Sequence, residues 1–263
     1  MQMKQKYLDL HFRYEGKKSK TMKIVQKIRQ KQESLMGHQG ITIGFLGDSV
    51  TQGCFELYMK NAETAETCFD QNCGYHNYLK IILSMLFPRV PINIINGGIS
   101  GNDAVQGLQR LERDILRYHP DLLVVCFGLN DSVKGLDKIQ EYTEALKGIF
   151  KKLLEEEIEV IFMTPNMMCT EISPHLEKEK FRHIAEQAVV IQTEQVMDAY
   201  MDAAIKVCQE YEIKVCDCYR KWKKFQESGV IISDLLANYI NHPTREMNWL
   251  FAVSLVETMF EIS

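Results

Sequence analysis

After residue 40, short apolar segments alternate with longer segments of helical periodicity. The short segments are rich in apolar and β-branched residues, which indicates strands. They are ITIGFLG (41–47), PINIING (91–97), DLLVVCFG (121–128), EVIFMTP (159–165) and EIKVCD (212–217). The third is apolar throughout, as expected of a strand that is covered on both faces. The chain is therefore predicted to contain five strands.

Helices are predicted between these strands. One face of residues 103–118 carries apolar side chains at helical spacing: Ala104, Val105, Leu108, Leu111 and Ile115. The other expected helices are 76–87, 137–154, 176–209 and a last one in 242–262, where Pro243 suits a first helical position. Regular alternation of strand and helix predicts an α/β fold, with helices on both faces of a five-stranded parallel sheet.

Small and polar residues follow the strands, and they are the candidate site. Open α/β sheets bind ligands beyond the carboxyl ends of their strands. The first strand is followed by GDS (47–49), the second by NGGISGND (96–103) and the third by GLNDS (128–132). Near the end of the chain, NYINHPT contains His242. We therefore expect these segments to converge at one edge of the sheet.

Such a set of residues can run nucleophilic catalysis. A serine hydroxyl needs a base within hydrogen-bond reach, and histidine is the usual base. The oxyanion that forms needs preorganised donors. Ser49, His242, the N–H of Gly98 and the side chain of Asn130 supply these parts. The simpler interpretation of Gly-Asp-Ser is ordinary turn chemistry, but the other segments favour a nucleophile.

These motifs resemble those of the SGNH hydrolases, also called GDSL-type esterases and lipases. The family's four blocks match GDSVTQG (47–53), NGGISG (96–101), GLND (128–131) and NHP (241–243) in the right order. The resemblance spans about residues 41–260. It implies a flavodoxin-like three-layer α/β/α fold and hydrolysis of an ester or related acyl bond. The implied catalytic residues are Ser49 as nucleophile and His242 as base, with Gly98 and Asn130 in the oxyanion hole.

One position departs from the family pattern, which commonly has an acidic residue three positions before the histidine. Tyr239 stands there and cannot be an anion near neutral pH. Three alternatives follow. Asn238 orients His242 without a charge, Asp234 folds back to it, or a backbone carbonyl holds the imidazole and leaves a Ser-His dyad. We favour the uncharged arrangement.

Charge divides the chain into two parts. The 263 residues carry a net charge of -4, which makes no case for nucleic acid binding by the whole molecule. Residues 1–31 nevertheless hold ten Lys and Arg against Asp9 and Glu15. We predict a basic, largely helical extension over residues 1–40, with EGKKSK (15–20) as a loose link, and a hydrolase domain over residues 41–263. A solvated extension is favoured over an anchor for anionic lipid or nucleic acid.

Other patterns narrow the function. No signal peptide or membrane-spanning segment is recognised in the sequence, so a cytoplasmic location is expected. The eight cysteines include no CxxC pair, no metal-ligand cluster occurs, and neither G-x-G-x-x-G nor a P-loop is present, so no metal or cofactor is expected. This weakens the main rival, a nucleotide- or flavin-binding domain.

The expected partner is a small-molecule ester. A small-acyl or O-acetyl ester of a carbohydrate or similar polar compound is favoured. A lysophospholipase or thioesterase acting on longer acyl chains is the alternative, as is a catalytically impaired relative that binds a small molecule. The aromatic and Met-rich segments GCFELYMK (53–60) and TPNMMC (164–169) either line an acyl or sugar pocket or belong to the core. The sequence is also compatible with a homo-oligomer.

Overall fold

The computed structural model describes residues 21–262, and its centre is a five-stranded parallel sheet. The strand order is β4-β1-β5-β6-β7, and all four pairings are parallel. The strands are β1 (Ile41–Gly47), β4 (Ile92–Gly98), β5 (Leu122–Cys126), β6 (Glu159–Met163) and β7 (Lys214–Cys216). Every residue of β5 is buried, as its apolar sequence predicts. The predicted fold class and all five strands are confirmed.

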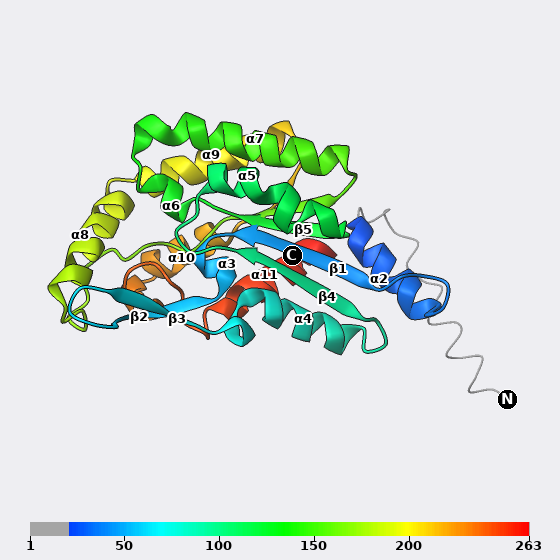
Figure 1. Ribbon diagram of the computed structural model, residues 1–263, viewed down its shortest axis with the longest axis horizontal. Helices are drawn as coiled ribbons and strands as arrows, with labels where there is room; N and C mark the ends of the chain where they lie inside the picture. The colour runs from blue at the N-terminus through cyan, green and yellow to red at the C-terminus, as the bar shows by residue number, and fades with distance from the viewer. Residues whose placement is uncertain (1–20, 263) are drawn as a thin grey trace.

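Helices cover both faces of this sheet (Figure 1). One face carries α4 (Tyr75–Leu86) and α11 (Asn248–Phe260), which pack on each other. The other face carries α5 (Ala104–Asp114), α7 (Ile139–Glu155) and α9 (Val196–Glu210). The remaining helices are α2 (Lys23–Glu33), α3 (Ser49–Gln52), α6 (Leu129–Ser132), α8 (Glu179–Thr193) and α10 (Cys218–Glu227). Short 3₁₀ turns are η1 (Gln71–Cys73), η2 (Leu116–Tyr118), η3 (Leu136–Lys138) and η4 (Ile232–Leu235).

Two predicted helices differ from the structure. The stretch 176–209 is divided into α8 and α9 because Gln195 takes a left-handed conformation, with φ at 62°, and ends the helical path. The last helix begins at Asn248 and not at Pro243. Pro243 instead forms an isolated antiparallel bridge with Leu236, so the chain stays extended there. The prediction that Pro243 opens the last helix is therefore wrong.

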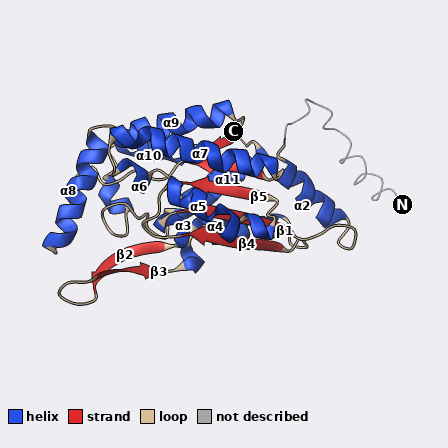
Figure 2. Cartoon of the chain, turned by 45° about the horizontal axis from the view of Figure 1, so that its top comes forward, coloured by secondary structure: helices blue, strands red, loops and turns tan. Residues whose placement is uncertain are grey.

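A two-stranded antiparallel hairpin follows α3 and was not predicted. It consists of β2 (Cys54–Met59) and β3 (Ala65–Phe69). Figure 2 shows the hairpin standing apart from the main sheet. It lies at the end towards which β1 points, where α8 also lies (Figure 1). The hairpin therefore borders the edge of the sheet where the candidate residues were expected.

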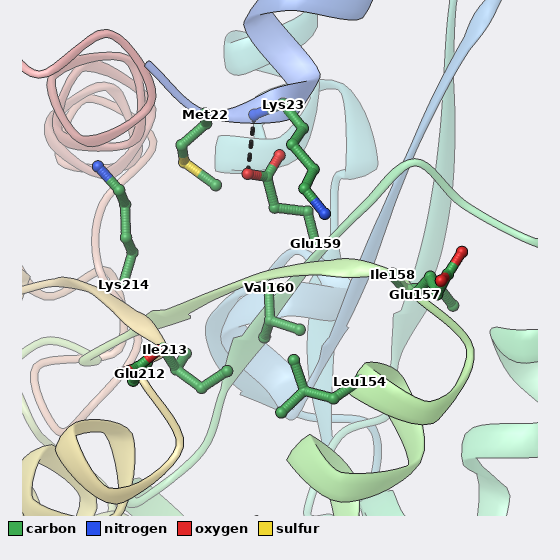
Figure 3. A pocket seen from close by; sticks show the side chains of 10 residues that line it. All are labelled: Met22, Lys23, Leu154, Glu157, Ile158, Glu159, Val160, Glu212, Ile213 and Lys214. Atoms are coloured by element: carbon green, nitrogen blue, oxygen red, sulfur yellow. Dashed lines mark hydrogen bonds between the residues drawn. The ribbon is translucent and has the colours of Figure 1, made fainter. Parts of the chain in front are cut away.

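The amino-terminal edge of the sheet carries α2. Its apolar face is buried through Ile24, Val25 and Ile28. The backbone N–H groups of Lys23 and Ile24 donate to the Glu159 carboxylate at 2.9 and 2.8 Å, which places a negative charge at the helix N-terminus. Figure 3 shows this contact beside a cavity of about 320 Å³ where β6 and β7 begin. Residues 1–20 of the predicted extension, including the EGKKSK link, lie outside the described residues.

Within residues 21–262, no helix is both long and apolar enough to cross a membrane. The same part of the chain holds no group of His, Cys, Asp or Glu side chains arranged to bind a metal ion.

Candidate active site

Ser49 lies at the tight turn between β1 and α3, where it is the first residue of the helix. Asp48 caps that helix, because its Oδ1 accepts the Val50 N–H at 3.0 Å. A Cβ at Gly47 would lie 2.0 Å from Thr51 Oγ1 and 2.7 Å from the Cys126 carbonyl oxygen, so only glycine fits. The GDS sequence is therefore the local requirement for ending a central strand and starting a helix within two residues.

The Ser49 hydroxyl contacts the imidazole of His242. The distance from Ser49 Oγ to His242 Nε2 is 3.0 Å, and both residues are almost fully buried. On its other side, His242 Nδ1 lies 2.9 Å from the carbonyl oxygen of Phe55 in β2. A carbonyl can only accept, so the proton is on Nδ1 and the lone pair of Nε2 faces the serine. This is the arrangement that a general base for Ser49 requires.

Asn238 supports the backbone around His242 and does not touch its ring. Its Oδ1 accepts the backbone N–H groups of Ile240, Asn241 and His242 at 3.0, 2.9 and 2.9 Å. Our preference for Asn238 as the orienter of the imidazole is therefore corrected: the third alternative, a backbone carbonyl, describes the structure.

No carboxylate among the described residues forms a hydrogen bond or ion pair with the His242 ring. Asp234 lies in η4 with an exposed side chain, so the structure does not support it as the orienting acid. Burial lowers the pKa of His242 below its ordinary value, and the Phe55 carbonyl opposes this only in part. A neutral acceptor has replaced the negative charge that would raise this pKa.

Gly98 is not placed as an oxyanion donor. Its N–H already donates to Asn96 Oδ1 at 2.9 Å. A Cβ at this position would lie 2.2 Å from the backbone nitrogen of Gln52, so glycine is needed for the close packing of β4 against α3. The prediction that the Gly98 N–H is a donor is corrected for this reason.

Gly101, three residues further on, is the better candidate and was missed. It is exposed, has φ at 79°, and its N–H has no hydrogen-bond partner within residues 21–262. Its loop is fixed beside the nucleophile, because Ile99 N–H donates to the Gly47 carbonyl at 3.1 Å and Ser100 N–H to Gln52 Oε1 at 2.7 Å. A glycine in a loop after a strand was the available signal, but choosing between two glycines requires the backbone angles.

The other donors are the Ser49 backbone and Asn130. The Ser49 N–H opens α3 and, among the described residues, has no acceptor. Asn130 Nδ2 donates one hydrogen to the Asn102 carbonyl at 2.8 Å, which leaves its second hydrogen for a ligand. Asp131 braces the same region, since its Oδ1 accepts the Ala104 N–H at 3.0 Å.

Arg110 is a buried cation at this edge that the sequence did not indicate. Its guanidinium donates to the Gly97 carbonyl, and to the Gly47 carbonyl at 2.8 Å. It also donates to Asn102 Oδ1 at 2.8 Å, so it connects the ends of β1 and β4 with the loop that follows β4. Its role is to hold these three segments in register below the site.

The two Met-rich segments behave differently. Met167, Met168 and Cys169 are fully buried, so TPNMMC belongs to the core. In contrast, β2 contributes residues 56–59, including Leu57, Tyr58 and Met59, to a cavity of about 340 Å³ whose other walls are residues 175–178, Phe181 and 237–239. A second hollow of about 520 Å³ lies between α8 and Val133, close to Asn130 in sequence.

Comparisons with known proteins show which family and which folds this chain is similar to. The model of the GDSL-like Lipase/Acylhydrolase family matches residues 45–250. An acetylxylan esterase from Geobacillus stearothermophilus is 26% identical over 130 residues, which is 46% of this chain and 58% of that protein. A GDSL esterase/lipase from Oryza sativa subsp. japonica is 26% identical over 155 residues, covering 54% and 56%. The matches thus span little more than half the length of these curated relatives.

Solved structures show the same fold. A crystal structure of an acetylxylan esterase from Geobacillus stearothermophilus has a TM-score of 0.62 at 20% identity, over 84% of this chain and 94% of that one. Structures of its catalytic mutants, in which a serine or an aspartate is replaced by alanine, match equally well. A second crystal structure of an acetyl xylan esterase has a TM-score of 0.60 at 19% identity, covering 82% of this chain and 98% of that one.

Proposed function

The chain belongs to the GDSL-like lipase/acylhydrolase family, and from that premise we propose that it is a serine esterase that hydrolyses a carboxylic ester. The observation that carries the proposal is the 3.0 Å contact between Ser49 Oγ and His242 Nε2. It lies at the carboxyl edge of the sheet, beside backbone donors that have no partner among the described residues.

The reaction follows from these positions. Ser49 Oγ attacks the ester carbonyl carbon while His242 Nε2 takes the hydroxyl proton. The oxyanion accepts hydrogen bonds from the N–H groups of Ser49 and Gly101 and from the side chain of Asn130. Collapse of the tetrahedral intermediate expels the alcohol, which receives the proton from His242. Water then attacks the acyl-serine while His242 takes a proton from it; the bond to Ser49 Oγ breaks, His242 returns the proton to Ser49, and the acid is released.

The favoured substrate is an O-acetyl or other small-acyl ester of a carbohydrate or similar polar alcohol. Two supports point this way: one curated relative is an acetylxylan esterase, and several of the similar solved structures are too. The catalytic mutants of that relative include one at an aspartate. In our proposal this chain works without such an acid, because the Phe55 carbonyl takes its place at Nδ1.

One observation favours a second candidate, an esterase for longer acyl chains. Val133, Val190 and Ile191 line the hollow of about 520 Å³ beside the segment that carries Asn130. Val133 and Val190 are each at least half exposed, so an acyl chain would bury apolar surface there. Preference for decanoyl over acetyl esters would select this candidate.

The test combines labelling with turnover. A fluorophosphonate probe followed by peptide mass spectrometry should modify Ser49 in the wild type and not in His242→Ala. Hydrolysis of p-nitrophenyl acetate, butyrate and decanoate should fall by at least about 10³-fold in Ser49→Ala, because removing a member of the nucleophile–base unit removes most of the catalysis. Ser84→Ala is the matched control, since Ser84 is exposed on α4.

Absence of labelling, together with equal turnover by wild type and Ser49→Ala, contradicts the proposal. That result would identify the chain as a binding relative that has lost the reaction.

A further inference from the structure

The acceptor that orients His242 belongs to a hairpin outside the main sheet. Phe55 lies in β2, and β2 pairs only with β3 within the described residues. An isolated two-stranded hairpin is marginally stable in water. A backbone carbonyl moves with its strand, so its position is fixed only if the strand itself is fixed. The distance of 2.9 Å between the Phe55 oxygen and His242 Nδ1 therefore depends on what fixes this hairpin relative to the His242 loop.

Arg245 makes that connection from three residues after His242. Its Nη1 and Nη2 donate to the two carboxylate oxygens of Glu56, at 2.5 and 3.1 Å. Its guanidinium carbon lies 4.3 Å from the centroid of the Phe55 ring. The Arg245 guanidinium thus contacts the side chains of both Phe55 and Glu56. The Phe55 carbonyl that accepts from His242 lies between these two residues in the backbone.

The same guanidinium also reaches the second strand and the base of the hairpin. Its Nε lies 3.4 Å from Asp70 Oδ2, and Nη2 is 3.8 Å from Cys68 Sγ in β3. Asp70 N–H in turn donates to the Gly53 carbonyl at 2.9 Å, which closes the base of the hairpin next to α3. One side chain from the His242 loop therefore contacts both strands of the hairpin and its base.

We propose that Arg245, paired with Glu56, is a positioning residue: it fixes the Phe55 carbonyl on His242 Nδ1 and so does the orienting work that a catalytic aspartate does in a triad. This inference rests on the proposed esterase function. Arg245 itself touches neither the reacting serine nor the imidazole.

The contribution is geometric more than energetic. Arg245 and Glu56 are 31% and 46% exposed, and exposed ion pairs add little to stability. The bidentate, stacked geometry nevertheless restricts Phe55 in direction and distance. Lysine cannot reproduce it, because an ammonium is a point charge without a planar fork. Loss of the Arg245–Glu56 pair should therefore lower kcat strongly and the melting temperature only slightly.

The kinetic test compares Arg245→Ala, Arg245→Lys, Glu56→Gln and the double variant Arg245→Ala/Glu56→Gln with the wild type on p-nitrophenyl acetate. We expect kcat to fall about 10- to 10³-fold in Arg245→Ala with KM nearly unchanged, since mis-orientation of the base in a triad costs at most about 10⁴-fold. Arg245→Lys should recover only part of the loss. The double variant should be hardly worse than Arg245→Ala alone, because the pair acts as a unit.

A spectroscopic readout separates positioning from stability. In protein labelled with ¹⁵N-histidine, His242 should show a protonated Nδ1 and an unprotonated Nε2, with the assignment made from His242→Gln. In Arg245→Ala this tautomer signature should move towards an average of both forms. Lys224→Ala is the matched control: Lys224 on α10 pairs with Glu227 at 2.6 Å, both side chains are more than half exposed, and removal of this pair should change neither kcat nor the spectrum.

Unchanged kcat and an unchanged His242 spectrum in Arg245→Ala would overturn the proposal. If Arg245→Ala fails to fold, the same two measurements on Glu56→Gln and Arg245→Lys decide. Failure of the esterase function is detected separately, as equal turnover by wild type and Ser49→Ala. In that case the His242 spectrum alone still confirms or refutes the positioning role of Arg245.

Discussion

Replacing Asn238 by alanine tests the support of the His242 loop most directly. The Asn238 side chain is buried, and its oxygen accepts three backbone N–H groups, including that of His242. A net contribution of about 1 kcal/mol per hydrogen bond gives a loss of about 3 kcal/mol in the free energy of unfolding. For a chain of this size, that corresponds to a drop of about 6–12 °C in melting temperature.

Turnover should fall as well, because the freed backbone no longer holds His242 at the serine. A displacement of about 1 Å at a reacting group costs on the order of 10²-fold in rate. Asn238→Asp keeps the accepting oxygen and should keep most of the stability and activity. Asp234→Asn should match the wild type, since Asp234 does not contact the His242 ring in the structure.

The assay pairs thermal unfolding, followed by circular dichroism, with kcat per active site, counted by fluorophosphonate titration. A melting temperature within about 2 °C of the wild type for Asn238→Ala, with unchanged kcat, would refute the reasoning, because a loss of about 3 kcal/mol must lower the transition by more than that. A large loss of activity in Asp234→Asn would also refute the reasoning, because it would identify Asp234 as the acid that orients His242.

Four further results are expected. Asn130→Ala should lower kcat on p-nitrophenyl acetate by about 10²–10³-fold with little change in KM, because it removes one oxyanion donor; unchanged kcat would exclude Asn130 from the oxyanion hole. The acidic limb of kcat/KM should have its midpoint below pH 6.5: neutral His242 is the active base, and burial lowers its pKa, so activity appears at lower pH; a midpoint above 6.5 would indicate an anionic partner. Tyr239→Asp should change kcat by less than about threefold, since the Tyr239 ring lies 5.3 Å from that of His175 and Nδ1 is already occupied; a large gain would contradict the role of the carbonyl. Asp48→Asn should raise the melting temperature more at pH 8 than at pH 4, because burial raises the pKa of Asp48 from 3.8 to about 7, so the cost of folding with this carboxyl grows over that range and is complete above pH 7; an equal effect at both pH values would show that folding does not shift this pKa.

The sheet could be predicted because its strands carry their signal locally. Residues 41–47 and 121–128 are apolar runs too short for helices, and burial on both faces leaves little choice of residue type. The hairpin of β2 and β3 has no such signal: only Cys54 and Phe55 are fully buried in β2, and residues 65–69 are all partly buried or exposed. Its position depends on contacts with Arg245, far away in sequence, and these no local pattern can reveal.

The same division holds within the site. The sequence was enough to identify Ser49, Asn130 and His242, because their side chains carry out the proposed reaction. Open α/β sheets bind ligands beyond the carboxyl ends of their strands, which predicts that these segments lie together. Gly98 was named and Gly101 was missed, because both are glycines near one strand end; φ and the hydrogen-bond state of each N–H distinguish them, and both are properties of the folded chain. The Phe55 carbonyl could not be found at all, because every residue has a carbonyl and only the fold selects one.

A neutral acceptor at His242 has a definite chemical consequence. The carbonyl fixes the tautomer as well as a carboxylate would, so Ser49 meets a lone pair at 3.0 Å. It does not supply the negative charge that stabilises the imidazolium once the proton has moved. Compared with a triad that has an aspartate, the activation barrier should therefore be higher for steps in which the proton is largely on His242 in the transition state. The difference should be greatest when His242 must protonate a poor leaving group. The donors at Ser49, Gly101 and Asn130 are unaffected by this loss, because they act on the oxyanion. Catalysis in this chain should accordingly depend more on oxyanion stabilisation than on its base, and esters with good leaving groups should benefit most.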